Sequence, residues 1–87
     1  MLKWEYKVLK SVNGLRVLNK GEILYDIPIK NELVFATVTC NHLYILEDTS
    51  LGGASTDIDL ETGDAETCVI KKGKRGEPVK WNVNKVK

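Results

Sequence analysis

Cys40 and His42 are the two residues of this chain best suited to chemistry, because a thiol beside an imidazole can form a thiolate nucleophile. Only Asn41 separates them, and we expect the chain to turn there. The sequence offers no third group at a spacing that would orient the imidazole, and no motif for an oxyanion hole. We therefore predict no catalytic residue, and expect a protein that is not an enzyme.

Metal binding has two candidate sets of ligands. Zinc would need Cys40, His42 and Cys68 with a carboxylate from a distant strand, without the close Cys and His spacings that bring zinc ligands together. A calcium loop starting at Asp57 would need glycine at its sixth position and glutamate at its twelfth, where Thr62 and Cys68 stand. We predict no metal and no cofactor. The acidic residues of this segment are interpreted as a solvated strand face that ends in a turn, and they are Asp57, Asp59, Glu61 and Asp64.

The charges of the second half of the chain are separated. Residues 47–70 contain seven acidic and no basic residues, whereas residues 71–87 contain seven basic residues and one acidic residue. Basic side chains near an aromatic ring are typical of a nucleic-acid surface. The candidates for such contacts are Lys71, Lys72, Lys74, Arg75, Lys80 and Trp81, although the alternation of Trp81 with Val79 and Val83 predicts that its ring faces the core.

Length and composition indicate one small globular unit. A chain of 87 residues is too short to divide its core in two, so we expect a single β domain over residues 1–87. The chain is 43% hydrophobic and 29% charged, and no run approaches the roughly 18 apolar residues of a membrane span. Its first ten residues do not resemble a signal peptide. We expect a cytoplasmic protein, without contact to a membrane, in which Cys40 and Cys68 are free thiols.

The elements that position these residues are predicted to be strands, centred on a hairpin over residues 33–47. Asn41 marks its turn, and either Cys40-Asn41 or Asn41-His42 can form the two-residue loop. Both registers give the same faces, because side chains alternate with period two along a strand. One face is expected to carry Val34, Ala36, Val38, Leu43 and Ile45, and the other Phe35, Thr37, Tyr44 and Leu46. This hairpin is therefore apolar on both sides.

A meander of three strands is predicted before it. Asn13-Gly14 favours a two-residue turn that would set Val12 opposite Leu15, and Asn19-Lys20-Gly21 favours a three-residue loop with Gly21 in the left-handed region. The resulting inner face would carry Trp4, Tyr6, Val8, Val12, Leu15, Val17, Ile23 and Tyr25.

Three further strands are predicted after the hairpin. Residues 48–55 contain Gly52-Gly53 and are expected to form a mobile loop. Strands should follow over residues 56–61 and 65–70, with Leu60 opposite Ala65, and over residues 79–83. No window has helical spacing. The predicted fold class is all-β, a small antiparallel meander of about seven or eight strands forming a barrel or sandwich.

The segment from Leu43 to Ile70, with LYILED and DIDLETGDAETCVI, resembles the outer strands of a blade in quinoprotein-like or WD-type propellers. The resemblance implies antiparallel strands joined by an aspartate-led turn. It carries no function across, because a propeller needs about four blades or more and this sequence has room for one.

We expect a noncatalytic binding or interaction protein that acts through a β-sheet surface, as a homo-oligomer or docked on a protein partner. The candidate contact residues are Leu9, Leu18 and Leu24, which the predicted register places on the outer side of the first three strands, with Leu9 opposite Leu18. Nucleic-acid binding through the basic C-terminal segment is one alternative. A β-pocket for a small ligand is another, supported by the aromatic residues Trp4, Tyr6, Tyr25, Phe35 and Tyr44.

Overall fold

The computed structural model describes residues 5–12, 14–49 and 52–83, and it is all-β. Two antiparallel sheets account for its nine strands. The first sheet contains β1 (Tyr6–Ser11), β2 (Gly14–Asn19) and β3 (Glu22–Pro28), in that order. The second contains β4 (Glu32–Thr39), β5 (His42–Thr49), β6 (Gly52–Asp59), β7 (Asp64–Lys71) and β8 (Lys74–Arg75), with β9 (Val79–Asn82) pairing with β7 beside β8.

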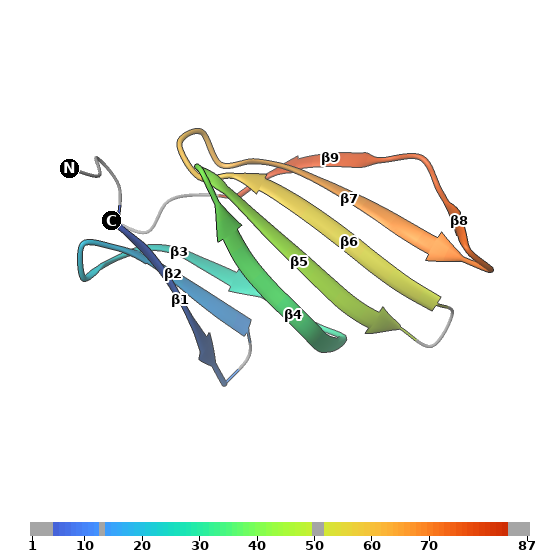
Figure 1. Cartoon of the computed structure of the whole chain (residues 1–87), viewed down its shortest axis with the longest axis horizontal. Helices are drawn as coiled ribbons and strands as arrows, with labels where there is room; N and C mark the ends of the chain where they lie inside the picture. The colour runs from blue at the N-terminus through green and yellow to red at the C-terminus, as the bar shows by residue number, and fades with distance from the viewer. Residues whose placement is uncertain (1–4, 13, 50–51, 84–87) are drawn as a thin grey trace.

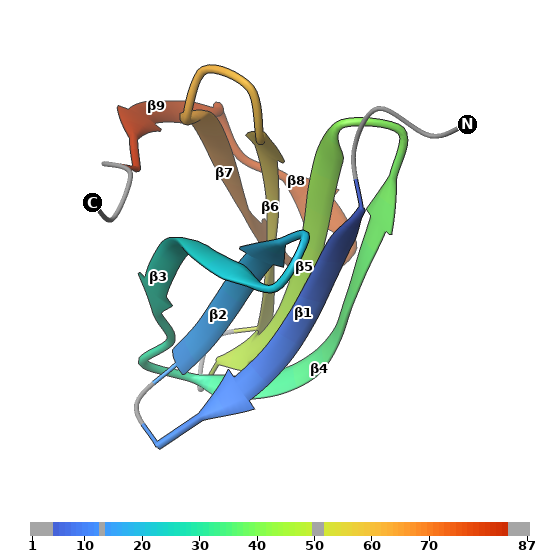
Figure 2. The same cartoon turned by 90° about the vertical axis from the view of Figure 1, so that its left-hand side faces the viewer.

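The three-stranded sheet packs against one face of the six-stranded sheet, as Figures 1 and 2 show. We call the packed face of the larger sheet its inner face and the opposite one its outer face. The predicted all-β class is confirmed, and because the described strands do not close into a barrel, the arrangement of the two sheets is sandwich-like at most. The order of the strands departs from a simple meander at β9, which returns to β7. No helix within the described ranges is long and apolar enough to cross a membrane.

Both sheets contribute to a single hydrophobic core. The buried side chains alternate with exposed ones along β2, β3, β5 and β6, as expected for strands that are covered on one side. Tyr25 is fully buried, and its hydroxyl donates a hydrogen bond of 2.8 Å to the carbonyl oxygen of Leu60 in the β6–β7 turn. The core consists of Leu15, Val17, Tyr25, Ile27, Leu43, Ile45, Ile58, Leu60, Ala65 and Val83.

The predicted turn at Asn13-Gly14 is wrong by one residue. Ser11 pairs with Gly14, so Gly14 is part of a strand pair and not of the loop, and Asn13 lies outside the described residues. Gly14 instead lies in β2 against β3, where a Cβ atom would stand 2.0 Å from the carbonyl oxygen of Ile27. The glycine is therefore required by a close approach between two strands. Val12 is consequently 98% exposed and does not join the predicted inner face.

A β-bulge also changes the β2–β3 register. Asn19 pairs with Glu22, so Lys20-Gly21 forms a two-residue loop in which both residues have positive φ, as in a type I′ turn. The prediction of positive φ at Gly21 is confirmed, but the three-residue loop is wrong. Leu18 pairs with Ile23 and Val17 with Tyr25, so the register shifts at Leu24, which is the extra residue of the bulge on β3.

The central hairpin is confirmed, with Cys40-Asn41 as its loop. Leu43 and Ile45 lie in the core, and Ala36 and Val38 pack against it, as the alternation predicts. Val34 is the exception, since a β-bulge between Leu33 and Phe35 leaves it 60% exposed. Leu33 packs against the core in its place.

The mobile loop predicted over residues 48–55 is wrong for the residues that the structure describes. Asp48 and Thr49 belong to β5 and residues 52–55 to β6, while Ser50 and Leu51 lie outside the described residues. Gly52 has a φ of 143°, and a Cβ atom there would stand 2.1 Å from the carbonyl oxygen of Ile70. Gly52, like Gly14, is therefore required because a neighbouring strand lies too close for a Cβ atom.

The β6–β7 connection is also shifted. Ile58, and not Leu60, pairs with Ala65, so that residues 60–63 form the loop and Leu60 turns into the core.

Candidate interaction surface

A row of side chains crosses the outer face of the larger sheet at the level of Phe35. Strand pairing sets Phe35 beside Leu46, Leu46 beside Ser55, and Ser55 beside Cys68. Paired residues project to the same side, so the four side chains lie on one face of β4, β5, β6 and β7. Tyr44 and Ile70 flank this row, because each lies two residues from one of its members along the same strand. We call Phe35, Tyr44, Leu46, Cys68 and Ile70 the apolar band.

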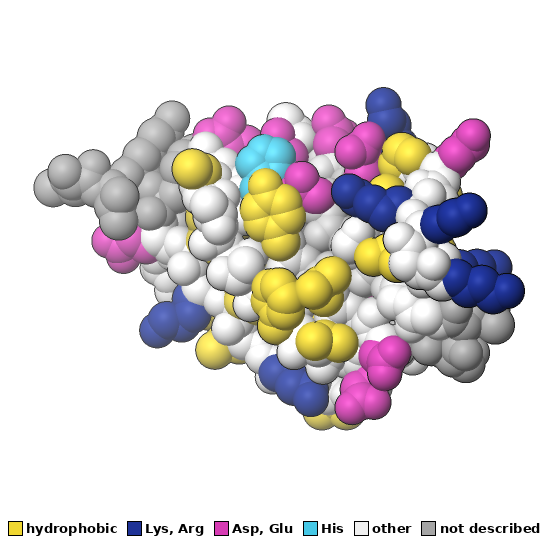
Figure 3. Space-filling view, turned by 45° about the vertical axis from the view of Figure 1, so that its right-hand side comes forward, with side chains coloured by type: hydrophobic (Ala, Val, Ile, Leu, Met, Phe, Trp, Pro, Cys, Tyr) yellow, Lys and Arg dark blue, Asp and Glu magenta, His cyan; other side chains and the backbone are white. Residues whose placement is uncertain are grey.

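The apolar band has no cover within the described chain. Phe35 is 47% exposed and Tyr44 is 41% exposed, and Leu46 and Ile70 are half-buried. Figure 3 looks onto this face, where yellow side chains gather below the histidine. Solvent exposure of two aromatic rings beside two aliphatic side chains is unfavourable, since each would release free energy on burial.

A hollow of about 550 Å³ lies next to the band, above β6 and β7. Cys68 is buried at its floor, and the Arg75 guanidinium donates to its sulfur at 3.6 Å. The side chains that line this hollow include Tyr44, Ile70 and Arg75. The outer face therefore combines exposed rings with a recess that a side chain of another molecule can enter.

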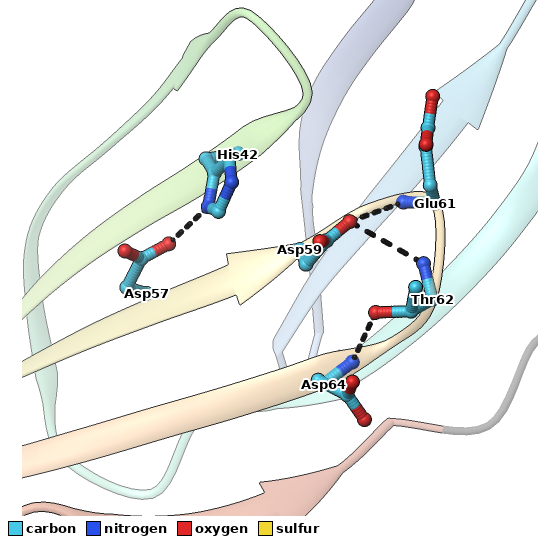
Figure 4. Close-up of polar contacts among 6 residues, drawn as sticks. All are labelled: His42, Asp57, Asp59, Glu61, Thr62 and Asp64. Atoms are coloured by element: carbon cyan, nitrogen blue, oxygen red, sulfur yellow. Dashed lines mark hydrogen bonds and ion pairs between the residues drawn. The ribbon is translucent and has the colours of Figure 1, made fainter.

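Acidic side chains lie at one end of the outer face, where β5 begins and β6 ends. The Nδ1 atom of His42 is 2.7 Å from Oδ1 of Asp57 (Figure 4). The His42 ring also stacks on the Tyr44 ring, with the ring centroids 6.2 Å apart. The hydrogen bond to Asp57 raises the pKa of His42, and burial lowers it by a smaller amount. His42 therefore contacts both an acidic residue, Asp57, and a member of the apolar band, Tyr44.

Two further acidic residues at this end, Asp59 and Asp64, form hydrogen bonds within the β6–β7 turn. Asp59 accepts hydrogen bonds from the backbone amides of Glu61 and Thr62, and the Thr62 hydroxyl accepts one from the amide of Asp64 (Figure 4). This confirms the interpretation of the segment as a strand end and turn. No group of three His, Cys, Asp or Glu side chains within the described ranges is arranged to hold a metal ion.

Basic side chains gather at the opposite end of β7, in the β7–β8 hairpin. Arg75 pairs with Ile70 and shares the outer face with it, whereas Lys71 and Lys74 pair with each other one residue further along and project to the inner side. All four basic residues of the hairpin are exposed, and they are Lys71, Lys72, Lys74 and Arg75. In Figure 3, acidic side chains border the upper edge of the face and several basic side chains gather toward its right-hand edge.

The residues predicted for interaction occupy three different environments. Leu9 pairs with Arg16 and not with Leu18, because the β1–β2 register is shifted by two residues. The bulge turns Leu24 toward the core, and Ile23 takes the outward position opposite Leu18. The first sheet therefore exposes Leu9, Ile23 and part of Leu18, interrupted by an ion pair of 3.8 Å between Arg16 and Asp26.

The residues predicted for nucleic-acid contact are not on one surface. Lys80 lies on the outer face beside Glu66, at an N–O distance of 3.9 Å, and is separated along β7 from the hairpin by roughly 17 Å. Trp81 projects from the inner face and donates a hydrogen bond of 2.9 Å to the Thr67 hydroxyl. It is 37% exposed and lies outside the core cluster, so its predicted burial is only partial. Lys71, Lys72, Lys74 and Arg75 alone form a cluster.

The described aromatic residues predicted to line a ligand pocket are divided between the core and the outer face. Tyr25 fills the core and Tyr6 packs against it, whereas Phe35 and Tyr44 lie on the outer face. Trp4 lies outside the described residues. Cys40 and Cys68 are both free, Cys40 exposed in its loop and Cys68 buried on the outer face.

The apolar band was not predicted as a site. The predicted second face of the central hairpin included Phe35, Tyr44 and Leu46 but did not extend to Cys68 and Ile70. The alternation of residues 64–70 was the available signal, since Cys68 and Ile70 share a side with Glu66. No family model, curated protein sequence or solved structure matches this chain.

Proposed function

We propose that this chain is a noncatalytic interaction protein that docks on a protein partner through the outer face of its six-stranded sheet. The observation that carries this proposal is the apolar band, in which two exposed aromatic rings and two half-buried aliphatic side chains lie on one face of β4, β5 and β7. Aromatic side chains with such exposure dominate the binding energy of many protein interfaces.

The surroundings of the band support a protein partner. Polar and charged side chains border it, with His42 and Asp57 at one end and Arg75 at the other. An apolar centre within a polar rim is the common composition of a protein–protein interface. The outward residues of the first sheet, Leu9 and Ile23, lack an aromatic ring and are separated by charged side chains, which makes that sheet the weaker candidate.

The proposal is tested by photo-cross-linking in cells. A photoreactive benzoylphenylalanine replaces Phe35 in the band, and in a matched control it replaces Val12, which is 98% exposed in the β1–β2 loop. We expect a discrete protein adduct from position 35 and none from position 12. Adding Tyr44→Lys to the first variant should abolish the adduct, because a charge would then have to be buried beside the contact.

Two results would contradict the proposal. One is the lack of any protein adduct at position 35. The other is an adduct that persists with Tyr44→Lys, since nonspecific collisions do not depend on the neighbouring ring. Cross-linking of position 35 to nucleic acid alone would favour the alternative function, in which the basic β7–β8 hairpin supplies phosphate contacts.

A further inference from the structure

We infer that a single-stranded nucleic acid binds a second surface of this chain, on the inner side of β7, β8 and β9. The first sheet leaves this part of the inner face open. In Figure 1 the β7–β8 hairpin extends to the right, away from β1, β2 and β3. The surface lies on the opposite side of the larger sheet from the apolar band, so the inference does not depend on the proposed function.

Strand pairing brings five exposed side chains together on this surface. Trp81 pairs with the core residue Ala65, and Lys74 pairs with Lys71. Positions 65, 67, 69 and 71 alternate along β7 with its outer-face positions, so their side chains and those of their partners project to the inner side. We call this group the inner strip, and its members are Val69, Lys71, Lys74, Val79 and Trp81.

The two lysines of the inner strip lie directly opposite each other on paired strands. Like charges in this position repel and destabilise a sheet. The carboxylates of β7, Asp64 and Glu66, alternate onto the outer face, where Lys80 lies 3.9 Å from Glu66. Neither Lys71 nor Lys74 forms an ion pair within the described residues. Two neighbouring ammonium groups are therefore left without a counterion, which an anionic ligand would supply.

The β7–β8 loop adds a third positive charge at this end. Lys72 and Gly73 form the loop with φ values of 51° and 76°, and Lys72 is exposed. On the inner face of the larger sheet, the described carboxylate is Glu47, which lies two strands from Val69 at roughly 10 Å. Glu77 is exposed in the β8–β9 connection. Three lysines outnumber these two carboxylates, so the excess charge is positive and attracts a polyanion.

Trp81 supplies a stacking surface at the other end of the strip. Its indole nitrogen donates a hydrogen bond of 2.9 Å to the hydroxyl of Thr67 on the neighbouring strand, which fixes the ring across β7. The residue remains 37% exposed. Val69 and Val79 are 42% and 63% exposed, and they form a short apolar floor between the ring and the lysines. Every nucleobase has a π face that can stack on such a ring.

The combination favours a single strand over other anionic partners. From the level of Trp81 to that of Lys71 the strip is six residues long, or roughly 20 Å, so one strand can stack a base on the ring and set its phosphates at the lysines. A duplex keeps its base faces stacked on one another. The valine side chains are too short to reach the acyl chains beneath lipid headgroups. Because the indole N–H is already bonded, we expect little preference among base sequences.

Fluorescence anisotropy of the purified full chain tests the inference. The probe is a labelled single-stranded oligonucleotide of about 12 nucleotides with mixed sequence, at about 50 to 200 mM salt. We expect saturable binding at the lowest salt, with a slope of log affinity against log salt near about −2, since each of three phosphate contacts contributes about 0.7. Lys71→Ala with Lys74→Ala should weaken binding about tenfold or more and reduce the slope by about 1.4.

Two matched controls separate this surface from general charge attraction. Lys7→Ala with Lys80→Ala removes the same charge from exposed side chains outside the strip, and it should leave the affinity within about threefold. Trp81→Ala should weaken binding about fivefold or more, whereas Trp81→Phe retains a ring and should bind within about threefold of the original chain. Unchanged circular dichroism confirms that each variant is folded. The variant without Lys71 and Lys74 should be no less stable in urea, because their repulsion is removed.

Three results with these variants would overturn the inference. They are a lack of binding at about 50 mM salt, equal weakening by the two lysine-to-alanine pairs, and unchanged affinity in Trp81→Ala. Tighter binding of a duplex of the same sequence would show that phosphate attraction alone is at work.

Two further probes identify a different partner, and either would also overturn the inference. Binding to phosphatidylserine vesicles without binding to the oligonucleotide would indicate a membrane surface, and displacement of the oligonucleotide by an equal concentration of polyglutamate would indicate an acidic peptide. None of these results bears on the adduct at position 35, which probes the outer face.

Discussion

Removal of the Tyr25 hydroxyl tests how the two sheets are joined. This hydroxyl is fully buried and donates to the Leu60 carbonyl oxygen at 2.8 Å, which ties the first sheet to the β6–β7 turn. In Tyr25→Phe the carbonyl remains buried without this donor, and an unpaired buried polar group costs about 1 to 3 kcal/mol. We therefore expect the free energy of unfolding to fall by about 2 kcal/mol.

The effect is large enough to measure accurately. A domain of this length loses about 4 to 8 °C of melting temperature per kcal/mol, and its urea midpoint should move by about 1 M or more. Tyr44→Phe is the matched control, because it removes a hydroxyl from an exposed ring on the outer face, and it should change stability by less than about 0.5 kcal/mol.

The pH dependence supplies an independent check. Burial raises the pKa of Tyr25, with further contributions from Tyr6, Asp59 and Asp64. The unfolded chain ionises this phenol near pH 10, whereas the folded chain retains the proton to higher pH. The stability gained from Tyr25 is therefore complete below pH 10 and is lost as the pH rises through the folded pKa. The difference between the original chain and Tyr25→Phe should shrink over that range.

Two results would refute this reasoning. Equal urea midpoints for the original chain and Tyr25→Phe would show that the hydrogen bond does not stabilise the fold. A stability difference that stays constant from about pH 8 to about pH 11 would show that the buried phenol ionises no differently from an exposed one.

Two further predictions concern His42 and the leucines selected from the sequence. The hydrogen bond to Asp57 raises the pKa of His42, so its stabilising effect should be complete below pH 6.5 and disappear as the pH rises through the folded value. The side chains of His42 and Asp57 are both about 40% exposed, which limits this contribution to roughly a few tenths of a kcal/mol. NMR titration should show a lower pKa for His42 in Asp57→Asn than in the original chain. An unchanged pKa of His42 would disprove the coupling. Leu24→Asp should lower the free energy of unfolding by about 2 kcal/mol or more because Leu24 packs against the core, whereas Leu9→Asp, on a side chain 47% exposed, should change it by less than about 0.5 kcal/mol in urea unfolding. Equal effects of these two substitutions would contradict the bulge at Leu24.

The side-chain faces of the central hairpin could be predicted from the sequence. Leu43 and Ile45 alternate with Tyr44 and Leu46, and this alternation fixes which residues share a face. An even shift of register leaves the faces unchanged, so uncertainty about the turn at Asn41 did not matter. The all-β class followed in the same way, because period-two patterns recur along the chain without helical spacing.

Only the tertiary structure decided the registers and the two bulges. Gly14 and Gly52 have the local signature of turns, yet each is required where a neighbouring strand comes too close for a Cβ atom. Local sequence cannot distinguish these two uses of glycine, because the second depends on a strand distant along the chain. The same limit applies at Leu24, where one extra residue in β3 reverses the side that leucine faces.

The candidate surface was also decided by the pairing of distant strands. The sequence predicted that Phe35 and Tyr44 share a face, but not that β6 and β7 extend it to Cys68 and Ile70. Nor did it show which face would stay open. The three-stranded sheet can cover only one side of the larger sheet, and the core side chains of β2 and β3 select the inner one. Local alternation determines what each face contains, whereas the packing of one sheet on the other determines which face remains available for a partner.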